Sequence, residues 1–130
     1  MTTAAAQRLR VLPTEFTVEH LPVGHPPPDG SWYVLHRAPE GLTVVRESRP
    51  TSQQEPPDAA PQERWAGLYG ELSHDLDLPG MLAAVLGPLA AAGVPVFVSS
   101  SFHSDLVLVP RERRDEACAV LRAAGHYMVG

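Results

Sequence analysis

The chain has 130 residues, of which 44% are hydrophobic, and carries a formal net charge of −5. That length is enough for one compact domain or for two very small ones that share a core. The acidic balance provides no basic surface for tracking phosphates, so we expect no nucleic-acid partner. The single cysteine, Cys118, excludes an internal disulfide and a cysteine-rich zinc site.

Hydropathy argues against a membrane protein. No apolar run approaches the ~20 residues that a membrane-spanning helix requires. Residues 1–7 lack the charged start and the apolar core of a signal peptide. We therefore expect a cytoplasmic protein without a membrane partner.

The first elements are short strands interrupted by prolines. Residues 9–12 and 16–21 alternate apolar and polar side chains, which is typical of strands, and Pro13 separates them. Residues 23–30 contain three consecutive prolines, which forbid a helix or a central strand there.

A β-hairpin follows, over residues 31–48. Two segments rich in β-branched and aromatic residues flank the turn at residues 38–41, where Pro39 and Gly41 suit a chain reversal. Residues 49–63 then hold four prolines and almost no apolar side chain, which indicates a solvated connection between two halves of the chain.

The second half begins with a strand at residues 64–72, where Gly67 and Gly70 indicate a bulge or a close approach of other atoms to the backbone. A helix is predicted after the Asp-Leu-Pro-Gly turn and ends at Gly93, which tolerates the left-handed conformation. Its apolar residues lie on one face because they are spaced by three or four. They are Leu82, Val85, Leu86 and Leu89.

Two strands, at residues 94–99 and 106–109, come next. A second amphipathic helix covers residues 111–125, and residues 126–129 form a final edge strand. The apolar face of this helix is expected to consist of Ala117, Val120, Leu121 and Ala124. Its first residues, Arg-Glu-Arg-Arg-Asp-Glu, are mixed in charge and are interpreted as a solvated face.

The order strand, helix, strand, strand, helix, strand predicts an α+β fold of the ferredoxin-like βαββαβ type, with both helices on one face of a four-stranded antiparallel sheet. The first half repeats the strand count, with proline-rich loops in place of helices. An incomplete structural repeat is one interpretation, although the two halves show no convincing sequence repeat.

Three stretches of the second half resemble an ACT domain: DLPGML at 77–82, LAAAGVPVFVSSS at 89–101 and DLVLV at 105–109. They are similar to the tandem ACT modules of aspartate kinases, and the whole chain resembles small stand-alone bacterial proteins with two ACT-like halves. The resemblance implies a reduced ACT-like half with its connection at residues 9–63 and an ACT domain at residues 64–130. It also implies regulatory binding of a small ligand, typically an amino acid, without cofactor or catalysis.

The start of the first helix is the first part of the candidate site. Gly80 leaves the helix N-terminus uncovered, and Pro79 suits the first helical position. Free N–H groups and the helix dipole then favour an anion such as a carboxylate. Asp75 and Asp77 stand before the helix and could hold the ammonium group of an amino acid. The alternative is that Asp77 merely caps the helix.

The resemblance places the second part of the site on the strand at residues 96–99. Phe97 occupies a position that is acidic in some lysine-responsive relatives, so an apolar or aromatic ligand side chain suits it better. The alternative is that the serines after Val98 form an ordinary polar strand end. The full set of expected ligand-binding residues is Asp75, Asp77, Leu78, Pro79, Gly80, Met81, Leu82, Val96, Phe97, Val98 and Ser99.

Catalysis and metal binding are not expected. Ser101, His103 and Asp105 suggest a hydrolase, but their spacing alone does not assemble a nucleophile, a base and an orienting group, and the sequence has no G-x-S-x-G motif. The six histidines include no H-x-H or H-x-x-x-H pair.

The sequence is therefore compatible with two functions. The first is a regulatory ACT-like protein that binds a small amino acid between its halves or at a dimer interface, with a homodimer formed through the sheets. The second is a protein–protein interaction module that pairs through exposed sheet edges and binds no metabolite.

Overall fold

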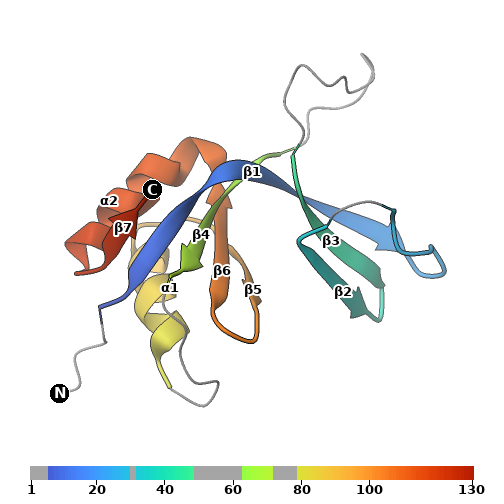
Figure 1. The fold of residues 1–130 in the computed structure, drawn as a ribbon, viewed down its shortest axis with the longest axis horizontal. Coiled ribbons are helices and arrows are strands. Elements are labelled where there is room, and N and C mark those ends of the chain that lie inside the picture. Colours follow the sequence, from blue (N-terminus) through green and yellow to red (C-terminus); the bar gives the residue numbers. More distant parts are fainter. Residues whose placement is uncertain (1–5, 30–31, 49–62, 72–78) are drawn as a thin grey trace.

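The structure, a computed structural model, describes residues 6–29, 32–48, 63–71 and 79–130. In these ranges the chain forms seven strands and two α-helices, with a short 3-10 turn, η1, before the second helix (Figure 1). Their bounds are β1 Arg8–Pro22, β2 Val34–Ala38, β3 Gly41–Glu47, β4 Trp65–Gly70, α1 Met81–Ala91, β5 Phe97–Ser100, β6 Asp105–Pro110, η1 Arg111–Arg113, α2 Arg114–Ala123 and β7 Tyr127–Val129. The predicted α+β class and the predicted hairpin, formed by β2 and β3, are confirmed.

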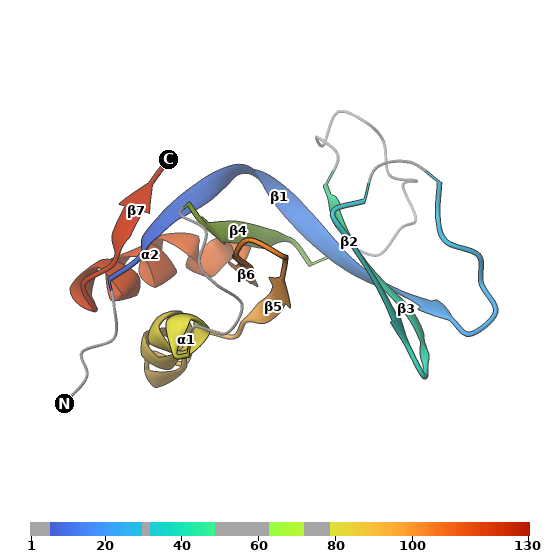
Figure 2. The same ribbon diagram turned by 60° about the horizontal axis from the view of Figure 1, so that its bottom comes forward.

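Strand β1 runs through both parts of the sheet. The strand order is β2-β3-β1-β4-β6-β5, and β7 pairs with β1 in parallel. The start of β1 lies between β7 and β4, whereas residues 16–22 pair with β3. Figure 2 shows β1 arching from α2 and β7 across to the β2–β3 hairpin. The first half of the chain therefore supplies a strand to the sheet of the second half.

This arrangement corrects the predicted four-stranded antiparallel sheet. The order β4-α1-β5-β6-α2-β7 is the one expected, but β1 is inserted between β7 and β4, and the β1–β7 pair is parallel. Local sequence patterns do not specify which distant strand pairs with which, so the insertion could not be predicted from them. The boundary at residues 63 and 64 stays a prediction.

Pro13 lies within β1 and does not divide it, contrary to the two separate runs expected. The register of β1 against β4 shifts between Val11 and Glu15, which marks a β-bulge or irregularity at this point. Proline has no N–H to donate to a ladder, and within sheets it is tolerated at bulges. The strand therefore bends at Pro13 and continues.

Both helices end at the glycines expected. In α1, the N–H of Gly93 donates to Ala90 O at 3.0 Å and that of Val94 to Leu89 O at 2.9 Å, which is the Schellman pattern. Gly93 has a φ of 72°, the left-handed region. Val94 completes this motif and Pro95 cannot donate, so β5 begins only at Phe97 and not at residue 94. Gly125 ends α2 in the same way.

Two apolar clusters cover the two faces of the central strands. The first lies between the sheet and both helices, and the second between the sheet and the β2–β3 hairpin. Side chains of β6 alternate between them: Val107 and Val109 join the first, and Leu106 and Leu108 join the second. The fully or largely buried members of the first cluster are Leu9, Ala66, Leu68, Val85, Leu89, Val94, Val107, Val109, Ala117, Cys118 and Leu121. Those of the second are Phe16, Val45, Leu106 and Leu108.

The predicted faces of the helices are largely as expected. Val85 and Leu89 of α1 are buried. In α2, Cys118 is buried and Ala124 is exposed, which corrects the expected face at its end. Ala124 lies at the C-cap, where the helix has ended and its side chain is turned away from the sheet. Burial raises the pKa of the Cys118 thiol.

Candidate functional site

The N-terminus of α1 carries no side-chain cap. Gly80 is the N-cap residue, with a φ of 82°, and its carbonyl accepts the N–H of Ala84 at 3.0 Å. Met81 is the first helical residue, so Pro79 lies in the preceding turn and not at the first helical position as predicted. A left-handed residue is needed to enter the helix here, and glycine adopts that conformation without cost to a Cβ. The first turn also contains no acidic residue.

His126 and Gln7 form hydrogen bonds with two backbone carbonyl groups at the start of α1. The N–H of Gln7 donates to His126 Nδ1 at 3.0 Å, which leaves Nε2 as the donor to Ala84 O at 2.8 Å. The Gln7 side-chain amide donates to Met81 O at 2.5 Å. His126 is buried. The helix start is thereby fixed to the beginnings of β1 and β7.

Strand β5 runs back along α1, so only one end of it lies near the helix start. Figure 1 shows the start of α1 and the β5–β6 turn at the same, lower end of the molecule. Ser99 is at that end. Val96 follows the other end of the helix, and an 11-residue helix is about 16 Å long. Ser99 therefore belongs to the end of β5 on this side of the molecule, whereas Val96 lies before the opposite end of the strand.

Phe97 and Val98 point to opposite faces of the sheet, as neighbouring residues of a strand do. Val98 packs against the first cluster, on the side of the helices. Phe97 packs against the second cluster, beneath the hairpin, and is half-buried. Three other predicted site residues, Asp75, Asp77 and Leu78, lie outside the described residues.

Glu71 is the acidic group that ends β4, just before the candidate site in the sequence. Arg8 Nε and Arg10 Nη2 donate to its two oxygens at 2.9 and 3.1 Å. The hydrogen bond from Arg8, assisted by Arg10, holds the pKa of the Glu71 carboxyl below its usual range. Its negative charge is already paired across β1 and β4.

The serines that follow β5 hold the β5–β6 turn together. Ser101 Oγ lies 2.8 Å from Tyr69 Oη and donates to Ser104 O at 3.0 Å. Ser100 Oγ donates to Asp105 Oδ1 at 2.5 Å. His103 is exposed, and its ring contacts Phe102. The hydroxyl of Ser101 is thus bound to Tyr69 and Ser104, which is a structural role in the turn.

Two hollows lie away from the helix start. One, of about 280 Å³, is formed by the loop after β1 and the β2–β3 turn. The other, of about 320 Å³, lies at the bend of β1 and is lined by three arginines, Arg64, Arg111 and Arg114. Neither hollow is expected from the local sequence patterns. Across the described ranges, no group of three or more histidine, cysteine or acidic side chains is placed to hold a metal ion.

The described residues form an α+β module in which α1 begins without a side-chain cap. Residues 61–123 match the ACT domain, in agreement with the resemblance found in the sequence. ACT domains in general serve regulatory binding of small molecules. No protein with a curated description matches the sequence.

Solved structures show the same fold over nearly the whole chain. The protein Atu0741 from Agobacterium tumefaciens is 23% identical, with a TM-score of 0.80, over 97% of this chain and 94% of its own. VC0802 from Vibrio cholerae, of unknown function and named as a possible transport protein, is 19% identical, with a TM-score of 0.71, over 96% and 92%. The alpha and beta subunits of an aspartokinase are 14% identical, with a TM-score of 0.64, over 92% and 98%.

These likenesses extend beyond the residues that match the ACT domain and include the β1–β3 region. At such identities they establish the fold alone. Neither helix in the described part of the chain is long and apolar enough to cross a membrane.

Proposed function

We infer that the protein is a regulatory sensor that binds a small amino acid at the start of α1 and performs no catalysis itself. The observation that carries this proposal is the N-terminus of α1, which begins at a left-handed glycine without a side-chain cap. Helix N-terminal N–H groups and the helix dipole stabilise a carboxylate. The match of residues 61–123 to the ACT domain supports a small-molecule ligand.

In this proposal the N–H groups of Gly80, Met81 and Leu82 receive the α-carboxylate. The residues before the helix, Asp75, Asp77, Leu78 and Pro79, belong to the same proposed site, in which the two aspartates balance the charge of the ammonium group. Ser99 closes the site from β5, with Val98 on the side of α1 and Val96 and Phe97 further from the helix start. Phe97 lies under the hairpin, where it contributes to ligand preference through the contact between the two parts of the chain.

We propose that the protein acts in the cytoplasm and that two copies associate through their sheets to form a homodimer. Its two functional parts are the reduced ACT-like half at residues 9–63 and the ACT domain at residues 64–130. Strand β1 links them directly, so a change of packing at the hairpin would reach the sheet that carries the site.

Two replacements of the same glycine test the site. Gly80→Ala and Gly80→Glu impose the same backbone strain, because any L-residue is strained at a φ of 82°, and the space around a Cβ at residue 80 is open. Of the two variants, only Gly80→Glu adds a negative charge beside the ligand carboxylate. We expect Gly80→Glu to raise the Kd of the bound amino acid about tenfold or more relative to Gly80→Ala.

The measurement is calorimetric titration of both variants with the common amino acid that stabilises the wild type most. Equal affinity of the two variants would remove the helix start as the carboxylate site. Circular dichroism checks that both variants fold to the same extent.

A second candidate function rests on the sheet edges. Strands β2 and β5 stand at the two ends of the strand order, and Phe102, beside β5, is 73% exposed. An open edge with an exposed aromatic residue is suited to pairing with another chain. Light scattering separates the two functions: association that no amino acid changes, and that Gly80→Glu leaves intact, favours an interaction module.

A further inference from the structure

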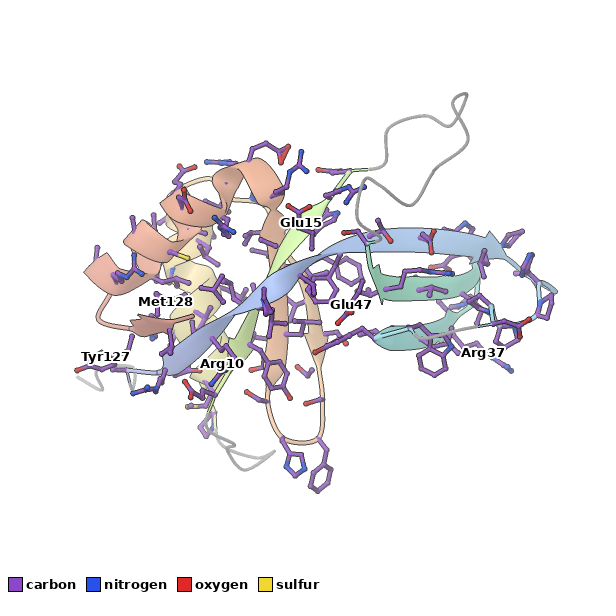
Figure 3. The ribbon with its side chains drawn as sticks, turned by 45° about the horizontal axis from the view of Figure 1, so that its top comes forward. Arg10, Glu15, Arg37, Glu47, Tyr127 and Met128 are labelled. Atoms are coloured by element: carbon purple, nitrogen blue, oxygen red, sulfur yellow. The ribbon has the colours of Figure 1, made fainter. Side chains whose placement is uncertain are left out.

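The hollow at the bend of β1 collects arginines from two separate parts of the chain. Arg64 immediately precedes β4, and Arg111 and Arg114 begin η1 and α2. Figure 3 shows Glu15 at the bend of β1. At this point β1 crosses β4 below the start of α2. The hollow has a volume of about 320 Å³. Its lining residues are Leu12, Pro13, Thr14, Glu15, Ser48, Arg64, Ala66, Arg111 and Arg114.

The bulge at Pro13 creates this hollow. Phe16 pairs with both β3 and β4, and Leu9 pairs with both β4 and β7, so β3 and β7 occupy the same edge of β1. Residues 12–14 lie between these two partners, and no described strand pairs with them on either edge. The bend of β1 therefore leaves a stretch of extended backbone as one wall, next to the arginines.

Positive charge exceeds negative charge among the described residues that line the hollow. They include three arginines and one carboxylate, Glu15, in a chain whose formal net charge is −5. Glu15 Oε1 lies 3.7 Å from Arg64 Nη1 and 3.5 Å from Arg111 Nη1. Both distances are longer than the ~2.7–2.9 Å of a close ionic hydrogen bond. One oxygen of Glu15 therefore lies within reach of both Arg64 and Arg111, and Arg64 has a further partner as well.

The position of Arg111 and Arg114 is unfavourable for the helix itself. They stand at the N-terminal end of the η1–α2 segment, where the helix dipole favours negative groups. Arg114 Nε lies 3.3 Å from Asp115 Oδ1, a side chain that is 92% exposed, and such surface pairs contribute little. Arginines at this end do not stabilise α2, whose dipole is complemented by Asp115 and Glu116 in its first turn, but they present positive charge to the hollow.

We propose that this hollow is a second binding site, separate from the start of α1, and that it takes a small acidic amino acid. Guanidinium groups bind carboxylates in a fork geometry, and an acidic amino acid carries two carboxylates for the arginines. Its ammonium group pairs with Glu15. Its short carbon chain lies over Ala66 and Leu12, which form the apolar part of the lining.

The test is calorimetric titration of the full chain, at low ionic strength, with L-aspartate, L-glutamate, succinate, L-leucine and inorganic phosphate. We expect L-aspartate or L-glutamate to bind the wild type, and L-leucine not to bind at this site. The double variant Arg111→Gln/Arg114→Gln should raise the Kd of the acidic amino acid about tenfold or more. Both side chains are about half exposed, at 53% and 52%, so the variant should fold.

Three further variants make the result specific. Arg122→Gln removes an exposed arginine of α2 outside the hollow and should leave the Kd unchanged. Gly80→Glu should also leave it unchanged, which separates this site from the helix start. Glu15→Gln should weaken the acidic amino acid but not succinate, which has no ammonium group.

The proposal is overturned if neither acidic amino acid binds, or if phosphate alone binds. It is equally overturned if the double variant binds as tightly as the wild type, or if Arg122→Gln weakens binding as much as the double variant does.

Discussion

Phe16→Ala is expected to lower the free energy of unfolding by about 3–5 kcal/mol, the range for truncating a fully buried phenylalanine. Phe16 is fully buried in the second cluster, pairs with Glu47 of β3 and Trp65 of β4, and contacts Tyr33 edge-on, with ring centroids 5.1 Å apart. Its removal empties the space between the hairpin and the central sheet. Urea unfolding followed by fluorescence of the two tryptophans measures the loss.

Phe102→Ala is the matched control, because Phe102 is 73% exposed in the β5–β6 turn. It should change the free energy of unfolding by no more than about 0.5 kcal/mol. A loss below about 1 kcal/mol for Phe16→Ala would mean that the hairpin does not pack on the sheet as described.

His126→Ala is expected to cost about 2–4 kcal/mol of stability, because it leaves two partly buried backbone groups without their partner. These are the N–H of Gln7 and the carbonyl of Ala84, which His126 joins through its two ring nitrogens. The change should also loosen the start of α1, so hydrogen exchange in its first turn should speed up more than exchange in β6.

The control for this prediction is His103→Ala, since His103 is exposed and its ring contacts that of the exposed Phe102. Its free energy of unfolding should stay within about 0.5 kcal/mol of the wild type. If the two histidine variants were equally stable, His126 would not connect β1, α1 and the end of α2.

Local sequence patterns predicted the features that depend only on residues close together in the chain. Gly93 and Gly125 end the helices because the left-handed conformation needed there suits glycine, and that requirement is visible in the sequence. Gly67 was expected to mark a close approach, and a Cβ there would lie 2.6 Å from Phe16 Cε2. The pairing of β1 with β3, β4 and β7 depends on contacts between distant segments, so periodicity could not show it.

The candidate site was predictable to a similar extent. The Pro79-Gly80 pair predicted an uncovered helix start, although the helix begins two residues after Pro79. The helix start is also connected to His126 and Gln7, which lie far from it in the sequence. Gln7, for example, is more than 70 positions from Met81. The arginine hollow was missed because Arg111 and Arg114 were interpreted as part of a solvated face, and only the fold brings them to Arg64 and Glu15.

The most direct test of the regulatory function is the thermal unfolding of the full chain in the presence of each common amino acid. A ligand present at 100 times its Kd should add about 2.7 kcal/mol to the free energy of unfolding. The proposed function predicts that at least one amino acid stabilises the wild type to this extent, and that Gly80→Glu reduces the effect. No stabilisation by any amino acid, or stabilisation by amino acids other than aspartate and glutamate that Gly80→Glu leaves entirely intact, would contradict a ligand site at the start of α1.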